Sequence, residues 1–354
     1  MIRQQLDTSI TKWRMTFIGL FVAMIVVFVM SLLLGSVSIP LNQTLKFLGG
    51  GTLDNSGWQA ILMNFRLPKA MTSILVGSAL GVSGLQMQTL FRNPLAGPFI
   101  LGISSGAGLG VALVIFLGIS FGVYFGLPDT ARNWLLVISA AGGSFLVLSI
   151  IGLAAIRVRS AVTLLIIGLM FGSLVSAVVS IMQFFSQAEN IQAYIIWSFG
   201  SLGSLSWSEL WILIPIVSGG LVVSFALSKN LNALLLGENY AASMGLNLRS
   251  IRLVIILCTS LLAGSVTAFC GPIAFVGLAI PHLARMLFNT SNHLLLTPLV
   301  ILLGAIAMLV FDLIAQLPGS DATLPINAVT SLLGAPFVIW LILRKNNLHY
   351  SFEK

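Results

Sequence analysis

Charged residues are scarce in this chain, and their scarcity limits what the protein can be. Only 7% of its 354 residues are Asp, Glu, Lys or Arg, whereas 58% are hydrophobic. The mean hydropathy is +1.06. A soluble fold of this composition would lack the polar side chains that cover a hydrophobic core. The composition therefore excludes a soluble protein and predicts an integral membrane protein.

Carboxylates are especially rare, with only nine Asp and Glu residues in the whole chain. Asp312 alone lies well inside an apolar stretch, and Glu209 lies at the edge of one. Proton- and sodium-driven carriers rely on carboxylates inside the membrane. A single such residue gives little support to an ion-coupled carrier. Asp312 itself stays open between an ion-coupling role and a structural, hydrogen-bonded role.

Other common signatures are also missing. The chain has no GxxxxGK(S/T) phosphate-binding loop, so we expect no ATPase activity, and ATP-driven work would require another polypeptide. Its cysteines, Cys258 and Cys270, would lie ~18 Å apart along one helix, too far for a disulfide. They indicate nothing about the redox compartment. We expect no metal site and no bound cofactor in this chain.

Long apolar stretches dominate what is present. Thr16–Leu34 contains no charged residue and is close to the roughly 20 residues that cross a bilayer. A signal peptide is the alternative here, because Arg3, Lys12 and Arg14 precede it, but the apolar run exceeds the ~7–15 residues of such peptides. The chain predicts about ten membrane-spanning helices, at 16–35, 67–90, 99–120, 134–156, 161–186, 208–228, 251–270, 274–288, 296–315 and 325–343, the eighth interrupted at Pro281.

The basic residues predict the orientation of these helices. With both termini in the cytoplasm, thirteen Lys and Arg residues lie inside and four lie outside. Since membranes retain positive residues on the cytoplasmic side, this bias supports an N-in, C-in arrangement. The net charge of +8 is dispersed rather than clustered, which argues against nucleic acid as a partner. We expect one transmembrane domain, residues 1–354, with residues 1–15 as a cytoplasmic N-terminus.

One cytoplasmic segment differs from the rest of the chain. The connection 229–250 is the longest on this side and contains the polar stretch LGENYAASMG, residues 236–245. Glu238 suits the positive end of a helix dipole, and Gly245 is a natural C-terminal stop. Because so short a helix is unstable alone in water, it must dock, either onto a partner protein or onto this chain.

Four stretches of the sequence resemble the permeases of ABC importers for iron–siderophores, haem and vitamin B12. In order they are RLPKAMTSILVGSALGVSGLQMQTLFRNPLAGPFILGISSGAG (66–108), GENYAASMG (237–245), GPIAFVGLAIPHLAR (271–285) and LPINAVTSLLGAPFVIW (324–340). They extend over nearly the whole chain from Arg66 onward. The resemblance implies an all-α, type II ABC importer permease with ten spans, which agrees with the count and orientation reached above.

The resemblance also implies partners and a substrate class. In this family two permeases, here expected to form a homodimer, surround a central pathway in the cytoplasmic (inner) membrane. Two cytoplasmic ATPase subunits bind ATP and Mg²⁺, and an extracytoplasmic binding protein delivers the substrate. The expected substrate is a bulky metal chelate. A ferric siderophore is the commonest case in the family, and haem and vitamin B12 are the alternatives. An ion-coupled secondary carrier or a passive channel would not account for residues 237–245.

The family assigns roles to matching residues at the cytoplasmic face. Its GE-containing segment forms coupling helices that sit in a groove of the ATPase, which implies this role here for Gly237, Glu238, Ala241 and Gly245. Asn93 and Leu95 match a cytoplasmic gate of the vitamin B12 importer, where Pro94 suits a turn. The second gate of that relative is rich in Ser and Thr, whereas this chain reads SAVTLL at 160–165.

At the outer face, the family uses paired basic residues of the RLP motif to dock acidic residues of the binding protein. Here they are Arg66 and Lys69. Without the resemblance, anchoring of a helix end at the interface is the simpler interpretation. A third basic residue commonly follows in a D-x-x-A-R pattern, but this chain has Gln316 after Asp312. Docking here therefore rests on fewer charges.

Pathway residues are the least determined by the sequence. The fifth span ends in SIMQFFSQ, where Met182, Gln183 and Phe184 either line the pathway or pack ordinarily. His282 lies in the IPHLAR stretch, which the family carries whatever its substrate, so a structural role is expected rather than haem ligation. His293 and His349 fall in predicted cytoplasmic loops.

Overall fold

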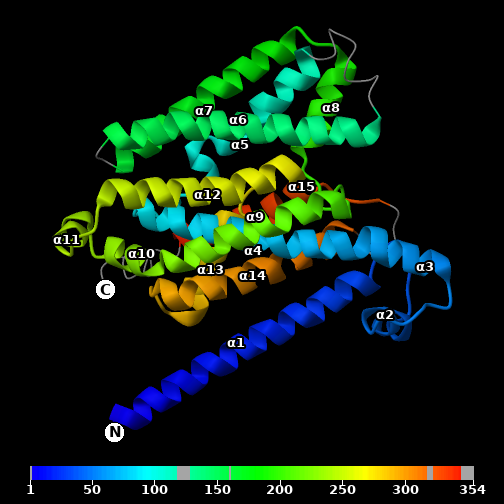
Figure 1. The fold of residues 1–354 in the computed structure, drawn as a ribbon, viewed down its shortest axis with the longest axis horizontal. Coiled ribbons are helices and arrows are strands. Elements are labelled where there is room, and N and C mark those ends of the chain that lie inside the picture. The colour runs from blue at the N-terminus through cyan, green and yellow to red at the C-terminus, as the bar shows by residue number, and fades with distance from the viewer. Residues whose placement is uncertain (1, 118–127, 159–160, 317–321, 344–354) are drawn as a thin grey trace.

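The computed structural model describes residues 2–117, 128–158, 161–316 and 322–343. Within those ranges every regular element is a helix, and no strand occurs. Figure 1 shows most of the long helices lying side by side along one axis, with α1 at one edge. The predicted all-α fold is confirmed.

The elements follow one another in short connections. In chain order they are α1 (Ile2–Leu33), α2 (Leu41–Leu48), α3 (Ser56–Ile61), η1 (Leu62–Arg66), α4 (Leu67–Leu90), η2 (Pro98–Leu101), α5 (Ile103–Ala112), η3 (Leu113–Leu117), α6 (Asp129–Arg157), α7 (Ala161–Phe184), α8 (Ala188–Ser198), α9 (Trp207–Ala226), α10 (Ser228–Leu235), α11 (Glu238–Ser243), α12 (Leu248–Cys270), α13 (Val276–Phe288), α14 (His293–Ala315) and α15 (Ile326–Leu343). Of these, η1 and η3 are π-helical turns and η2 is a 3-10 helix.

The membrane-spanning helices agree with the sequence prediction. Seven helices in the described ranges are long and apolar enough to cross a bilayer, and three shorter apolar helices accompany them. Each of the ten predicted spans overlaps one of these helices. The second begins earlier than predicted, since α3, η1 and α4 run on as one helix from Ser56 to Leu90. In Figure 1 the N-terminus and α11 lie at one end of the molecule, and α2 and α3 lie at the other, as expected for an N-in chain.

Helix α4 is the central element of the bundle. It is buried along most of its length and packs against α14, α13, α12 and α9. Gly77 of α4 and Gly304 of α14 lie so close that a methyl group on either would overlap the other's carbonyl oxygen. Small residues allow such close backbone approach in lipid, where packing rather than water drives helix association.

The predicted interruption of the eighth span at Pro281 is wrong. Helix α13 continues through this proline from Val276 to Phe288. Proline removes the donor that the carbonyl of Gly277 would use. That carbonyl packs directly against Gly84 of α4, so a neighbouring helix supports the weakened turn.

Candidate functional site

Arg66 lies at the extracytoplasmic end of α4, where the π-helical turn η1 joins α3 to α4. Its side chain is buried, with 8% of the residue exposed. The guanidinium donates hydrogen bonds to the carbonyl oxygens of Leu32 at 2.7 Å and Leu33 at 2.9 Å, and a further one to Val37. These carbonyls belong to the end of α1 and the turn after it. A cation at this position satisfies otherwise unpaired acceptors and the negative end of the helix dipole.

Lys69 lies one helical turn further along and pairs with an acid. Its Nζ is 2.9 Å from Oδ1 of Asp312 on α14, and the two side chains are 21% and 3% exposed. The side-chain amide of Gln316 donates to the other oxygen of Asp312 at 3.2 Å. The carboxylate of Asp312 is therefore held by an ion pair and a hydrogen bond. This arrangement agrees with the structural role that the sequence left open.

A cavity of about 680 Å³ opens beside these charges at the outer end of the bundle. Arg66, Lys69, Asp312 and Gln316 line one part of it, and the turn at 199–204 lines another. The structure thus brings the two predicted docking cations to a single cavity. Within this chain, both are already bound by its own acceptors.

At the cytoplasmic end, α10 and α11 form the segment predicted to couple to an ATPase. Gly237 joins them with φ +111°, a conformation that favours glycine. Glu238 pairs with Arg252 of α12 at 2.5 Å, and Ala241 is fully buried. At Gly245, φ is +85° and the hydrogen bonds of residues 245 and 246 back to Ala242 and Ala241 form a Schellman motif. The predicted helix stop at Gly245 is confirmed.

The outward surface of this segment comes from residues that the sequence analysis did not single out. Leu236, Tyr240 and Met244 are exposed large apolar side chains at four-residue spacing. Four-residue spacing places Tyr240 and Met244 on one side of α11 and its C-cap, whereas Leu236 lies before the break at Gly237. Glu238 and Ala241 face the bundle and fix the segment in place, whereas these three side chains are free to contact another protein. The spacing of Tyr240 and Met244 is the signal that could have identified these two.

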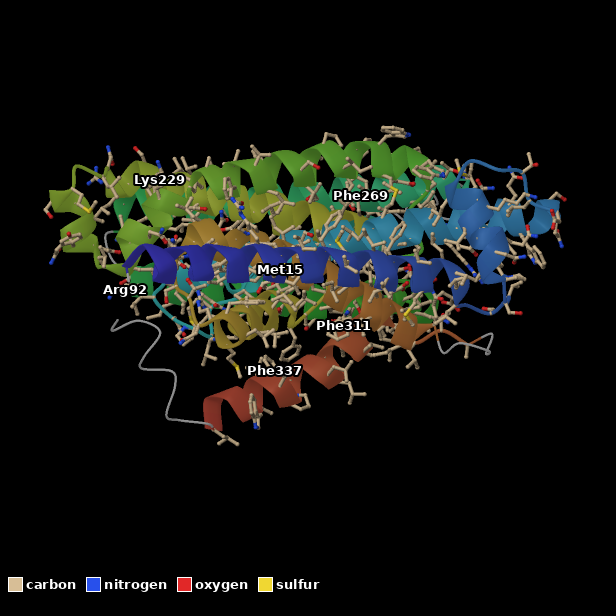
Figure 2. All side chains as sticks on the ribbon, turned by 90° about the horizontal axis from the view of Figure 1, so that it is seen from below. Met15, Arg92, Lys229, Phe269, Phe311 and Phe337 are labelled. Atoms are coloured by element: carbon tan, nitrogen blue, oxygen red, sulfur yellow. The ribbon has the colours of Figure 1, made fainter. Side chains whose placement is uncertain are left out.

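The predicted gate residues form an ordered turn after α4. Asn93 accepts a hydrogen bond through its side chain from the backbone NH of Leu95 at 2.9 Å, and Leu95 is exposed. The carbonyl of Pro94 lies 2.7 Å from Nε2 of the buried His282. His282 thus holds this turn against α13, in agreement with a structural role. Figure 2 shows Arg92, at the start of the turn, and Lys229 of α10 at the same end of the molecule.

A buried polar network lies between this turn and α10. His293 begins α14 and is fully buried, so its predicted place in a cytoplasmic loop is wrong. Its Nε2 lies 2.8 Å from Oγ1 of Thr89 on α4, and its Nδ1 lies 2.9 Å from Oδ1 of Asn232 on α10. The three side chains connect the end of α4 with the helix before α11. Residue 349 lies outside the described ranges.

The predicted pathway residues lie at the outer end of α7. Met182 packs partly into the bundle, whereas Phe184 is 83% exposed. Gln183 is half-buried between them. None of the three lines the outer cavity beside Arg66 and Lys69. A shallow depression of about 420 Å³, lined by Ser105, Ser173 and Ser176 among others, lies instead between α5 and α7. Of the predicted second gate, residue 160 lies outside the described ranges.

Comparisons with known proteins agree with these features. The model of the FecCD transport family matches residues 23–344. The hemin transport system permease protein HmuU of Yersinia pestis is 34% identical over 328 residues, 92% of this chain and 96% of the relative. The vitamin B12 import system permease protein BtuC of Klebsiella pneumoniae is 37% identical over 326 residues, 92% of each chain.

A solved structure supports the same assignment. A putative metal-chelate type ABC transporter in an inward-facing conformation has a TM-score of 0.81 and 31% identity to this chain. The match covers 94% of this chain and 99% of that one. Sequence and fold thus agree over nearly the whole length. The chain belongs to the FecCD transport family and is a multi-pass protein of the cytoplasmic membrane.

Proposed function

We propose that this chain is the permease subunit of an ATP-driven importer that moves a bulky metal chelate from a binding protein into the cytoplasm. The observation that carries the proposal is the α10–α11 segment. It is fixed to the bundle by the Glu238–Arg252 ion pair, yet it presents an exposed apolar side at the cytoplasmic end of a FecCD-family fold. Such a surface has no use in a carrier without a cytoplasmic partner.

The partner at this surface is a pair of ABC ATPase subunits. Leu236, Tyr240 and Met244 would enter a groove of the ATPase, because exposed aromatic and methionine side chains are typical contact residues. Gly237, Glu238, Ala241 and Gly245 would shape the segment rather than form most of the contact. ATP and Mg²⁺ would be bound by the ATPase and not by this chain.

At the outer face the partner is a substrate-binding protein. An acidic side chain entering the outer cavity would meet Lys69 and, behind it, Arg66. Lys69 keeps part of its side chain exposed, whereas Arg66 is committed to the end of α1. Lys69 would therefore contribute the direct contact, and Arg66 would hold the surface around it.

A second copy of this chain would complete the pathway. Helix α7 exposes Ile166, Met170, Leu174 and Phe184 along its length. This apolar side suits either lipid or the same helix of a partner copy. Met182 and Gln183 would then approach the pathway only in the dimer.

The substrate proposed here is a ferric siderophore, with haem and vitamin B12 as the alternatives. The two relatives are named for hemin and for vitamin B12 and have similar identity to this chain, 34% and 37%. Identity therefore does not separate the alternatives. What these substrates share is a bulky organic ligand that encloses a metal.

Native mass spectrometry of the tagged chain, purified gently from its host's membranes, tests the assembly. Two copies of the chain with two ATPase subunits are expected, and a bare monomer under conditions that preserve such complexes would contradict the proposal. The assembly in vesicles, supplied with the binding protein, then tests the substrate. ATP-dependent uptake is compared for ferric hydroxamates, haemin and cyanocobalamin, and the one that accumulates identifies the chelate.

A further inference from the structure

Helix α2, in the extracytoplasmic connection between α1 and α3, exposes its apolar side chains and buries polar ones. Leu41, Leu45 and Leu48 are 53%, 52% and 43% exposed, whereas Gln43 and Thr44 are buried. At 100° per residue the three leucines fall within an arc of ~60°. An apolar side of this kind is unfavourable in water, so it indicates a contact outside this chain.

The inner side of α2 is held by polar contacts that fix its rotation. The side chain of Gln43 donates to Asp54, which also pairs with Lys46 at 3.0 Å. Thr44 donates to the carbonyl of Pro40, at the start of the same helix, at 3.4 Å, which satisfies its hydroxyl. These partners keep the polar groups satisfied on the side facing the α2–α3 connection. Because Gln43 and Lys46 are both bound to Asp54, α2 is held in one orientation. In this orientation its three leucines are exposed.

The apolar side of α2 continues the exposed apolar surface of α1. Met30 near the end of α1, and Leu34 and Val37 in the connection to α2, are also exposed. Figure 1 shows α2 beside the outer end of α1, at the edge of the molecule, while α3 extends farther out. Helix α2 thus lies next to the outer end of α1, where the apolar run of that helix ends.

We propose that α2 is an interfacial anchor: it lies flat on the outer leaflet of the membrane, with Leu41, Leu45 and Leu48 inserted among the lipids. Amphipathic helices bind the boundary between headgroups and acyl chains with their apolar side. A helix of eight residues would bind weakly alone. Here α1 already crosses the bilayer and residues 34–40 tether α2 to it, so the effective concentration of lipid is high.

The anchor would fix more than α2. Val37 belongs to the tether and accepts a hydrogen bond from Arg66, and Arg66 lines the outer cavity. Attachment of α2 to the bilayer would thus hold the end of α1 and the rim of the cavity at a set height above the lipid. This attachment would form whether or not the chain transports a chelate.

Nitroxide probes on single cysteines test the anchor in the full-length chain. Cys258 and Cys270 are first replaced by alanine, and the protein is reconstituted in vesicles of phosphatidylethanolamine and phosphatidylglycerol. Probes at Leu45→Cys and Leu48→Cys are expected to collide several-fold more with oxygen, and several-fold less with a water-soluble nickel chelate, than a matched probe at the exposed Ser56→Cys. Equal nickel accessibility at all three positions would overturn the proposal.

A second variant separates lipid contact from misfolding. Leu41→Ser/Leu45→Ser changes only side chains that are exposed, so the thermal unfolding of the detergent-solubilised protein should not change. In vesicles, a probe at Leu48→Cys in this variant should become several-fold more accessible to nickel. Unchanged protection would contradict insertion. Protection that appears only after a soluble binding protein is added would assign the surface to that protein and likewise overturn the anchor.

Discussion

The outer and inner ends of the bundle use their polar residues differently. At the outer end, Arg66 and Lys69 are bound by acceptors of this chain, the carbonyls at the end of α1 and the carboxylate of Asp312. At the inner end, the Glu238–Arg252 ion pair holds α11 to α12, and neutral side chains such as His293 and Thr89 connect further helices. The exposed surface of α11 and its C-terminal end includes the large apolar side chains of Tyr240 and Met244.

This difference separates two kinds of partner contact. A cation that is already paired binds another acid only by exchanging partners, so contact at the outer end suits reversible encounter with a binding protein. Exposed apolar side chains have no partner within the chain that must be displaced, so their burial against another protein is favourable. The inner end therefore suits a lasting contact with the ATPase.

The largest effect is expected from removing one partner of the outer ion pair. Lys69→Met leaves the carboxylate of Asp312, which is 3% exposed, without its cation. Breaking a buried pair in this way costs ~3–5 kcal/mol, because an uncompensated charge stays buried. The variant should unfold at a clearly lower temperature in detergent.

A double variant provides the control for this prediction. Lys69→Met/Asp312→Leu removes both charges and should recover most of the lost stability. The same double variant should still bind the binding protein less tightly at low salt, since the docking cation is gone. If the single and double variants were equally stable, the pair would not be the stabilising interaction that its geometry indicates.

A smaller effect is expected at the inner surface. Tyr240→Ala removes an exposed aromatic side chain from α11 and should weaken binding of the ATPase by ~2 kcal/mol, about 30-fold, as for a central aromatic contact. Titration of the detergent-solubilised chain with the ATPase measures this. The stability of the chain itself should not change.

Two variants of the same segment sharpen this test. Tyr240→Phe keeps the ring and should bind nearly as the native chain does. Asn239→Ala, at the neighbouring exposed position, should have little effect. Equal losses for Asn239→Ala and Tyr240→Ala would show that the apolar side of α11 is not the contact surface.

The sequence predicted the parts of this comparison that depend on local pattern. The ten spans follow from the length of apolar runs, and the orientation follows from the Lys and Arg count, so neither needs knowledge of contacts. The turn at Gly245 follows from a single glycine after a short helix. Each of these features can be predicted from the sequence without knowing which helices are in contact.

Partners far apart in the chain could not be predicted in this way. The sequence predicts Arg66 as a docking cation of the RLP motif, yet its side chain is buried and two of its acceptors are on α1. His293 reads as a loop residue, yet it is buried between Thr89 and Asn232. The burial of Arg66 and of His293 depends on contacts between helices that are far apart in the sequence. A single residue carries no sequence pattern that would indicate such contacts. The predicted roles in docking and gating stay predictions.

The buried network at the inner end gives the next prediction. Thr89→Val keeps the shape of the side chain but removes the hydroxyl that meets Nε2 of His293. A buried polar atom left without a partner costs ~1–3 kcal/mol, so the unfolding temperature in detergent should fall. Thr267→Val is the matched control, because the hydroxyl of this buried threonine bonds only to Ala263 of its own helix. A loss no larger than that of the control would show that the network does not stabilise the inner end.

The smallest effect is expected at the outer end, beside α2. Hydrogen bonding to Lys46 lowers the pKa of Asp54 below its ordinary value of 3.8. A carboxylate with a lowered pKa stabilises the folded connection above its ordinary pKa, and this contribution is lost as the pH falls through the lowered value. A nitroxide at Ser56→Cys should therefore keep its mobility from pH 7 down to about 4 and gain mobility only in stronger acid. In Asp54→Asn the same probe should be equally mobile at all these pH values. A transition near neutral pH in the native chain would instead assign the change to a group other than Asp54.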